Sequence, residues 1–514
     1  MTRLIFFLTR FIVYFTILVL GLVTANAQQI TGRVIDSETS ESIPYATIRV
    51  GETDLISNDD GYFTLSGENA NESALLSVSF IGYATQKISV SELKQNNNII
   101  RLKEVLYDIG GVYVSNVKPD PNEVMKLVNE KLAKNYKSMD YKSTVFIRGS
   151  TTFSPKNFEM KLKKATDLSK SEVKEINQEI QYLIAKSTNT PAKIYSDRLT
   201  DVYKTTDEKN KAVYKLDVKK AVQLKDENRS SDYEELQKSS SQVFHKVMDT
   251  TKFYRIKSGL IGTKDTISFS KEYNKKKKNK KDSKDSNVSS AKSGIERIIN
   301  QSSFNGTATF LSSNIDFVKD TEAYTYNYVE ATYLGDDLVL VIDFKPKKSR
   351  AKYSGRMYIN EDDYAIIRAD YKLADGKKPQ GINLKLLLGV KMSEALTKGV
   401  VIYRKNPITN TYYLNYSLQE KEQYFYLNRP IKFIELTDGK EKDKIAYDIK
   451  VEGNNSEKIE YLNISMQNIS KSDYDSFQEK EFEYQILKKY DPSIWKGYNI
   501  IEPLEEMKKF EVVE

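Results

Sequence analysis

The sequence predicts a mainly β fold in which a small N-terminal β-sandwich precedes a large antiparallel-sheet α+β domain with packed helices. From Ile30, short β-rich runs alternate with clusters of Asp, Ser, Gly and Asn, which is typical of strands joined by turns. From Phe304, apolar and polar residues alternate through a long series of segments, the pattern of half-buried antiparallel strands. With 514 residues, 39% of them hydrophobic, the chain is long enough for each domain to have its own core.

Residues 1–27 have the features of a Sec-type signal peptide. Two arginines and an apolar stretch from Phe11 to Val23 are followed by the small residues Ala25 and Ala27, so we expect cleavage after Ala27. A retained membrane anchor is the alternative, because the apolar run is nearly long enough to span a bilayer. The protein is therefore expected to be exported to the periplasm or the outer-membrane periphery of a Gram-negative bacterium.

The first exported segment, residues 28–103, is predicted to be the sandwich. It has turn signals about every ten residues and no helical periodicity, which favours short strands packed in two layers. The expected strands are residues 29–36, 45–50, 61–66, 74–81, 84–90 and 98–103.

Five motifs follow one another in this segment. They are GRV-D at 32–36, IPYATIRV at 43–50, ISNDDGYFTL at 56–65, LLSVSFIGYATQKISV at 75–90 and IIRLKE at 99–104. In this order they resemble the carboxypeptidase-regulatory-like domain, a seven-stranded transthyretin-like sandwich common at the N-termini of envelope proteins in the Bacteroidetes lineage. The resemblance implies a seven-stranded sandwich and does not imply a peptidase.

Asp60 and Gly61 are predicted to form a structural turn. They lie between strand-like residues 53–57 and 62–66, and glycine accepts the positive φ that a tight hairpin needs. A calcium loop would require further oxygen ligands at alternate positions and a closing bidentate Glu, which do not follow here.

Composition excludes several classes of function. The chain has no cysteine, so disulfides, thiolate metal sites and a Cys nucleophile are excluded. His245 is the only histidine, whereas a zinc carboxypeptidase site needs two histidines and a glutamate. A Ser-His-Asp triad would rest on His245 without a G-x-S-x-G motif. A net charge of +8 without a recognition motif does not favour nucleic acid. We predict a protein that is not an enzyme and has no cofactor or metal.

Paired carboxylates are the remaining basis for hydrolytic chemistry. Asp36 and Glu38 form one pair, and the segments 336–337 and 361–363 lie at apparent hairpin tips. Asp and Glu are favoured at such tips by turn chemistry alone, so we interpret them as solvated turns.

Residues 104–118 are predicted to be a β-rich connector, and residues 119–514 the large domain. A helix is expected from Pro121, because Val124, Val128 and Leu132 form one apolar stripe. Further expected elements are a strand hairpin at 141–152 and 158–165, a helix at 170–187, strands over 193–223 and a helix at 231–248.

Residues 272–292 are low in complexity and rich in lysine. Charges of one sign at this density repel, so a mobile insertion is predicted. Its lysines are candidates for contact with an anionic surface such as lipopolysaccharide or phospholipid; they are Lys275, Lys276, Lys277, Lys278, Lys280 and Lys281.

The segments after Phe304, including GINLKLLLGVKM and SGRMYINEDDYAIIRADY, are expected to be strands joined by short polar turns. The order of helix, long antiparallel sheet and such a hairpin is similar to the LolA/LolB-like lipoprotein-carrier fold. In that fold a curved, open sheet wraps helices around an apolar cavity. Trp495, the only tryptophan, is expected to fill the core of the terminal segment.

Three hypotheses for function follow. In the first, the protein is a non-catalytic envelope protein whose large domain binds an amphipathic, lipid-like ligand or another envelope protein, in association with the outer membrane. In the second, it is purely structural and has no ligand cavity. In the third, which the sequence favours least, it is a carboxylate-based hydrolase.

Overall fold

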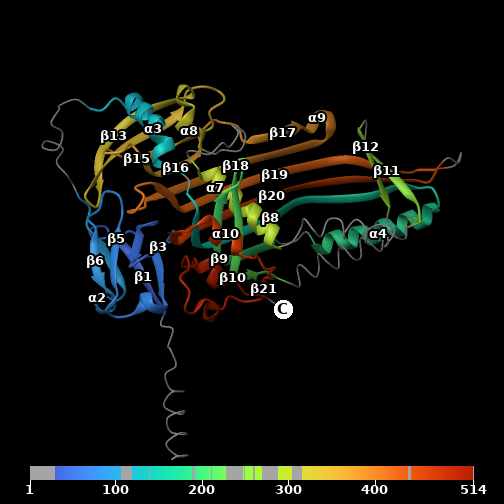
Figure 1. The fold of residues 1–514 in the computed structure, drawn as a ribbon. Helices are drawn as coiled ribbons and strands as arrows, with labels where there is room; N and C mark the ends of the chain where they lie inside the picture. Colours follow the sequence, from blue (N-terminus) through green and yellow to red (C-terminus); the bar gives the residue numbers. More distant parts are fainter. Residues whose placement is uncertain are drawn as a thin grey trace, which may run out of the picture.

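The computed structural model gives the fold in Figure 1. It describes residues 29–105, 118–137, 139–187, 192–209, 211–226, 247, 249, 251–258, 261–268, 287–303, 315–437 and 442–512. The predicted leader, most of the predicted connector, His245 and the six candidate lysines from Lys275 to Lys281 lie outside the described residues.

The N-terminal domain is a seven-stranded sandwich, as the resemblance implied. One sheet has the order β4-β1-β7 and the other β3-β2-β5-β6. Val34, Phe63 and Leu76 are wholly buried between them. The strands are β1 Gln29–Asp36, β2 Thr47–Val50, β3 Thr53–Ile56, β4 Tyr62–Ser66, β5 Leu75–Ser79, β6 Gln86–Ser89 and β7 Ile99–Leu102.

Two short helical elements of the sandwich were not expected. They are η1 (Gly67–Ala70) and α2 (Val90–Gln95). Ser89 and Glu92 form a capping box at the start of α2, which satisfies two backbone N–H groups that the helix leaves unpaired. A sequence too short for clear periodicity can therefore still form a helix when its cap is strong.

The turn at Asp60 and Gly61 joins the two sheets of the sandwich, so the expectation of a hairpin is wrong. β3 pairs with β2, whereas β4 pairs with β1. Asn58 organises the turn, because its Oδ1 accepts hydrogen bonds from the backbone N–H groups of Asp60 and Tyr62, both at 2.9 Å. Gly61 has φ +80°, which non-glycine residues rarely adopt.

The large domain is built on one 14-stranded sheet, in the main path order β13-β14-β15-β16-β18-β19-β20-β8-β9-β10-β21. The short strand β21 (Gln485–Leu487) is parallel to its neighbour β10. The other strands are β8 Tyr141–Ala165, β9 Ala192–Thr206, β10 Ala212–Leu224, β11 Phe253–Ser258, β12 Ile261–Ser268, β13 Tyr324–Leu334, β14 Asp337–Pro346, β15 Tyr353–Asn360, β16 Ile366–Leu373, β17 Gln380–Leu384, β18 Val390–Lys405, β19 Tyr412–Glu435 and β20 Lys444–Asn468.

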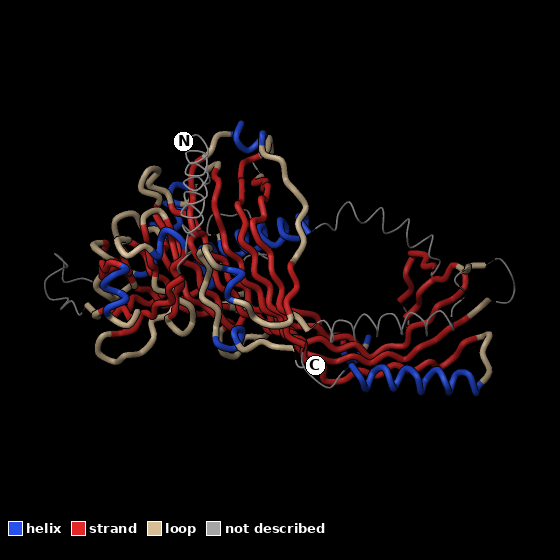
Figure 2. The backbone as a smooth tube through the Cα atoms, turned by 90° about the horizontal axis from the view of Figure 1, so that it is seen from below, coloured by secondary structure: helices blue, strands red, loops and turns tan. Residues whose placement is uncertain are grey.

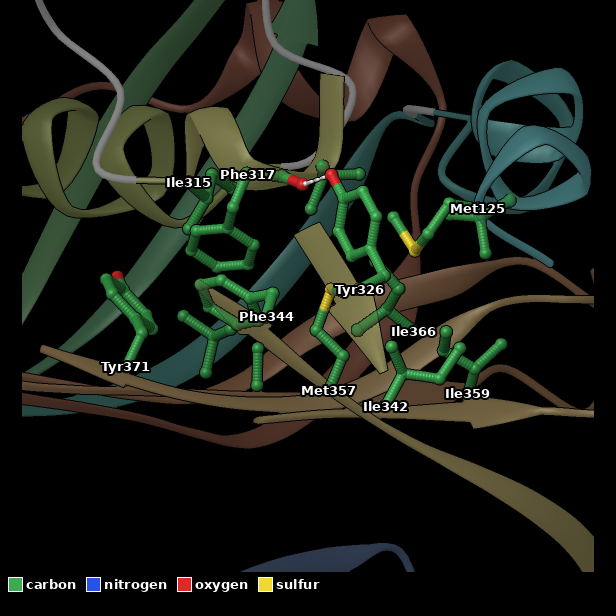
Figure 3. Close-up of a cluster of buried hydrophobic side chains, with 14 of the residues drawn as sticks. Met125, Ile315, Phe317, Tyr326, Ile342, Phe344, Met357, Ile359, Ile366 and Tyr371 are labelled. Carbon is green, nitrogen blue, oxygen red and sulfur yellow. Dashed lines mark hydrogen bonds between the residues drawn. The ribbon is translucent and has the colours of Figure 1, made fainter. Parts of the chain in front are cut away.

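At one end of this sheet, two helices cover a compact apolar core (Figure 3). The predicted stripe of α3 (Pro121–Asn135) is buried at Val124, Val128 and Leu132. The short helix α8 (Asp316–Lys319) and the turn η2 (Thr321–Ala323) complete the cover. Tyr326 donates a hydrogen bond from its hydroxyl to the Phe317 carbonyl oxygen at 2.6 Å, so the polar end of a buried ring is satisfied.

Residues 141–165 form the single strand β8, so the predicted hairpin in this segment is wrong. Pro155 lies inside β8, just beyond the last residue that pairs with β9, Phe153. The pairing of β8 with β20 shifts register next to Pro155. Proline is tolerated within sheets at such edge and bulge positions, so the strand continues through it.

Helix α4 (Lys170–Ser187) protects the edge of β8 that β9 leaves free. The Asn177 side chain accepts a hydrogen bond from the Leu162 N–H at 2.7 Å and donates one to the Leu162 carbonyl oxygen at 2.9 Å. Gln181 donates to the Met160 carbonyl oxygen at 3.1 Å. Figure 2 shows the long strands projecting from the body with a helix along their edge. An exposed strand edge is thereby closed by amide side chains.

Helix α7 (Asn287–Ser302) overlaps the predicted Lys-rich insertion. The expectation of a mobile segment is therefore wrong for residues 287–292. Val288, Ala291 and Ile295 are buried, because they form an apolar stripe that packs on the sheet.

The C-terminal segment packs across the opposite face of the sheet. Trp495 is 2% exposed and its ring meets Phe146 edge to face with centroids 5.4 Å apart, which confirms the prediction of a core residue. The segment includes α10 (Lys471–Ser476), η3 (Pro492–Trp495) and α11 (Glu505–Lys508). Within the described ranges, no helix combines the length and the apolar character needed to cross a bilayer.

Replacing Gly61 tests the turn between the sheets. A Cβ at Gly61 would lie 2.6 Å from the Val34 carbonyl oxygen, whereas a Cβ at Gly51, whose φ is +58°, would meet no atom within 4 Å. We expect Gly61→Val to lower the free energy of unfolding by about 3 kcal/mol and Gly51→Val by about 1 kcal/mol, since only the first adds a clash to the backbone strain. Urea unfolding of both variants measures the difference. Equal losses would contradict the role given to the close contact.

Candidate functional site

The outer halves of β8, β18, β19 and β20, together with β17 and β11, form a projection that we call the arm (Figure 2). Side chains alternate across a strand, so Phe425 and Leu427 lie on one face of the arm and Tyr424 and Tyr426 on the other. The two faces of the arm therefore differ in chemistry.

Strand register brings apolar residues from five strands onto the first face. Met392 pairs with Ile382 on one side and Phe425 on the other. In the next row, Val390 pairs with Leu384 and Leu427, and Leu427 pairs in turn with Val451. With Phe153 of β8, these residues form what we call the arm patch: Phe153, Ile382, Leu384, Val390, Met392, Phe425, Leu427 and Val451.

The arm patch is not covered by any described helix. Ile382 is 57% and Met392 58% exposed, and the described residues of the hydrophobic clusters include no member of the patch. The same face is covered on both sides of the patch. Toward the body α7 packs through Ile295 on Val145, and toward the tip α4 packs through Ile180 on Leu162.

Two phenylalanine rings form the centre of the patch. Phe153 and Phe425 stack with centroids 5.7 Å apart and an interplanar angle of 10°. The Phe425 ring lies over Gly453, where a Cβ would come within 2.7 Å of the ring. Glycine in a strand commonly marks such a close approach, so Gly453 leaves room for the aromatic pair.

A polar row borders the patch on the side of the body. Gln423 donates a hydrogen bond to a Glu394 carboxylate oxygen at 2.6 Å and accepts one from Asn455 at 3.1 Å. The Lys421 ammonium lies 3.7 Å from the other Glu394 oxygen. An apolar surface next to such a row presents both halves of an amphipathic contact.

The opposite face of the arm is polar. Glu452 accepts a hydrogen bond from the Tyr424 hydroxyl at 2.9 Å, and Lys450 forms an ion pair with Glu159 at 2.9 Å. The ammonium of Lys391 lies 5.0 Å from the centre of the Tyr424 ring. Water can solvate these groups, so this face needs no cover.

The sandwich docks on the body of the sheet through Asp59. Its carboxylate contacts Lys398 at 2.8 Å, and it also contacts Lys458 and the Tyr45 hydroxyl. Burial by itself raises the pKa of Asp59, but Lys458, together with the hydrogen bonds from Lys398 and Tyr45, outweighs it and holds the pKa well below the usual range. The paired carboxylate is therefore ionised at neutral pH.

Asp54 makes a second charged contact between the sandwich and the sheet. It forms an ion pair with Arg404 and accepts a hydrogen bond from the Tyr413 hydroxyl at 3.1 Å. Burial raises the pKa of Asp54 in spite of Arg404 and Arg49. The buried Asp54 and the half-buried Asp59 have partners on different strands. Together they fix the orientation of the sandwich, because charge pairs depend on geometry more than apolar contacts do.

A cavity of about 260 Å³ lies where the sandwich, the sheet and the C-terminal segment meet. Its walls carry charged side chains, including Arg148, Lys458, Glu460 and Glu502. Arg148 is held by both oxygens of Asp197, at 2.8 and 2.6 Å. This cavity is therefore unlike the apolar one that the lipoprotein-carrier similarity implied.

The carboxylates that the sequence singled out lie in turns or at the ends of strands. Asp36 accepts hydrogen bonds from the backbone N–H groups of Glu38 and Thr39 at 2.8 and 2.7 Å. Asp363 is bound by Lys405 at 2.8 Å and by the Tyr412 hydroxyl. Across the described residues, no group of three or more His, Asp or Glu side chains has the geometry to hold a metal ion.

Sequence analysis singled out Asp60, whereas the structure gives the interface contacts to its neighbour Asp59. Asp60 is exposed, and both aspartates belong to one turn signal, so the sequence alone cannot distinguish them. The arm patch was also missed. The sequence does contain a signal for it, because Ile382 and Leu384, and likewise Phe425 and Leu427, are apolar residues two positions apart and so share one face of a strand. The pairing between strands must be known before these positions can be assigned to one surface.

Replacing Asp59 tests the docking of the sandwich. We expect Asp59→Asn to lower the free energy of unfolding by about 2 kcal/mol, less than for a fully buried pair, because two ammonium groups lose their shared carboxylate. The pKa of Asp59 is lower in the folded protein than the value of about 3.9 in an unfolded chain. Its ion pairs therefore stabilise the fold fully above that unfolded pKa, and this stabilisation is lost as the pH falls through the folded pKa. The loss of unfolding free energy in Asp59→Asn should thus be constant between about pH 5 and 8.

Asp60→Asn is the matched control and should change the unfolding free energy by less than about 0.5 kcal/mol. Chemical denaturation at several pH values measures both variants. A loss for Asp60→Asn as large as that for Asp59→Asn would contradict the assignment.

Comparison with known proteins agrees with the fold of the N-terminal domain. Residues 30–114 match the family model of the CarboxypepD_reg-like domain. No curated protein matches the chain. A solved structure from Bacteroides fragilis, described as a membrane-associated protein of unknown function, shares 9% identity, covers 84% of this chain and 98% of its own, and has a TM-score of 0.11. The Bacteroidetes origin and the lipoprotein-carrier similarity stay predictions. The N-terminal sandwich of this chain is a carboxypeptidase-regulatory-like domain.

Proposed function

We propose that this protein is a non-catalytic binding protein of the cell envelope whose arm patch binds the acyl chain of an amphipathic ligand. One observation supports this proposal. Helices α7 and α4 bury the sheet face on either side of the arm patch, but no helix among the described residues covers the patch itself. Burying apolar area is the main favourable term in association, and an exposed contiguous apolar surface is rare unless it serves binding.

An amphipathic ligand suits the chemistry at the border of the patch. The row of Glu394, Gln423 and Asn455 offers hydrogen-bond donors and acceptors, and Lys421 adds a positive charge near Glu394. A zwitterionic headgroup could pair with both charges while its acyl chain lies on Phe425 and Leu427. A wholly apolar ligand would leave this row unused.

The sandwich would serve this function as a docking element. Its ion pairs at Asp54 and Asp59 hold it on the sheet face opposite α7, away from the arm patch. The export signal predicted at residues 1–27 supports a location in the envelope. The purely structural alternative predicts that the arm patch contacts a protein and that no amphiphile binds it.

Binding of a fluorescent lysophospholipid below its micelle concentration tests the proposal. We expect Met392→Asp to weaken the affinity about ten-fold, because a charge replaces an apolar contact next to Phe425. Ser393→Asp is the matched control, because Ser393 is next to Met392 in β18 and its side chain lies on the opposite face of the sheet. The affinity of this control variant for the probe should equal that of the unchanged protein. Circular dichroism of both variants verifies that they are folded.

If the unchanged protein does not bind the probe, or if both variants lose affinity equally, the arm patch is not an acyl site. The structural alternative would then replace it.

A further inference from the structure

The β17–β18 hairpin carries apolar side chains at its tip that have no role in the arm patch. The strands of this hairpin are joined by the helical turn α9 (Lys385–Leu388), so the single strand expected over residues 381–392 is wrong. Leu386 is 101% and Leu387 83% exposed. Figure 1 places α9 at the outer end of the hairpin.

We propose that this tip inserts into the surface of an anionic lipid bilayer. Two neighbouring leucines on a narrow, convex turn can be buried only by a partner that closes around them. The headgroup and acyl boundary of a bilayer does this without a preformed pocket, and apolar side chains enter it to a depth of roughly 5–10 Å.

The charges around the tip favour an anionic surface. Between Gln380 and Glu394, which pair at the inner end of the hairpin, the chain has two lysines, Lys385 and Lys391, and no acidic residue. Lysines next to an inserting segment attract anionic headgroups, so charge and apolar exposure point to the same partner.

Aromatic rings hold both lysines close to the tip. The Lys385 ammonium lies 4.0 Å from the centre of the Tyr426 ring, and the Lys391 ammonium 5.0 Å from that of Tyr424. Gly389, with φ +62°, closes the turn, and a Cβ there would come within 2.1 Å of the Asn428 carbonyl oxygen. The Gly389 carbonyl oxygen also accepts a hydrogen bond from the Asn428 N–H at 2.8 Å, so the turn is attached to β19.

Binding to vesicles of phosphatidylcholine with and without phosphatidylglycerol tests the proposal. The unchanged protein is expected to bind the vesicles that contain phosphatidylglycerol and to be released as salt screens the charges. The double variant Leu386→Asp, Leu387→Asp should bind at least about ten-fold more weakly. Lys385→Gln with Lys391→Gln should lower binding about ten-fold on the anionic vesicles alone.

Ile408 supplies the control for the leucines. It is 83% exposed in the turn between β18 and β19, so Ile408→Asp makes the same kind of change outside the tip and should leave vesicle binding unchanged. A tryptophan at either position reports insertion directly. Leu387→Trp should show a blue shift in fluorescence on adding vesicles, whereas Ile408→Trp should show none.

The proposal fails if the unchanged protein does not bind anionic vesicles, or if the leucine double variant binds as well as the unchanged protein. It also fails if neutralising Lys275 to Lys281 abolishes binding while the tip variants do not affect it. Lysophospholipid binding without vesicles is independent of these outcomes, because Leu386 and Leu387 are not part of the arm patch. Loss of one activity without the other therefore distinguishes this proposal from the proposed function.

Discussion

The pairing of β8 with β20 is the interaction on which the rest of the structure depends. Each strand is 25 residues long, and they pair from Tyr141 with Asn468 at one end to Ala165 with Ile445 at the other. In the body, helices and the sandwich cover both faces of this ladder. Beyond the body the ladder continues with the same alternation of apolar and polar residues, so an apolar face extends past the elements that cover it.

The faces of the sheet are thus shared among several covering elements, each fixed by a different kind of contact. Helices α4 and α7 pack through apolar stripes, whereas the sandwich adds ion pairs at Asp54 and Asp59. An apolar contact tolerates small shifts, but the carboxylate of Asp59 must meet both Lys398 on β18 and Lys458 on β20, the two strands on either side of β19. The sandwich is for this reason held in one orientation, and the arm extends from a rigid base.

The elements that depend on local sequence could be predicted. The helix at Val124 and Leu132 has a clear stripe, and Trp495 is an apolar residue among apolar neighbours. The length of β8 could not be predicted, because a proline usually marks the end of a strand. Pro155 is tolerated within β8 because the pairing with β9 has already ended at Phe153. The arm patch depends on the register of strand pairing, which brings Phe153 and Phe425 into contact although they are 272 positions apart in the sequence. The local sequence around either residue does not indicate this contact.

The amide side chains that close the edge of β8 have a consequence for synthesis. Asn177 is 15 residues from its partner Leu162, whereas Lys450 is 291 residues from its partner Glu159. During synthesis, helix α4 can therefore protect one edge of β8 soon after β8 leaves the ribosome. The other edge stays unpaired until β20, which is encoded much later in the chain, has been made. Long-range strand pairing is slow and exposes segments to aggregation. The order of elements along the chain thus reduces the unpaired backbone that a nascent β8 presents to other chains.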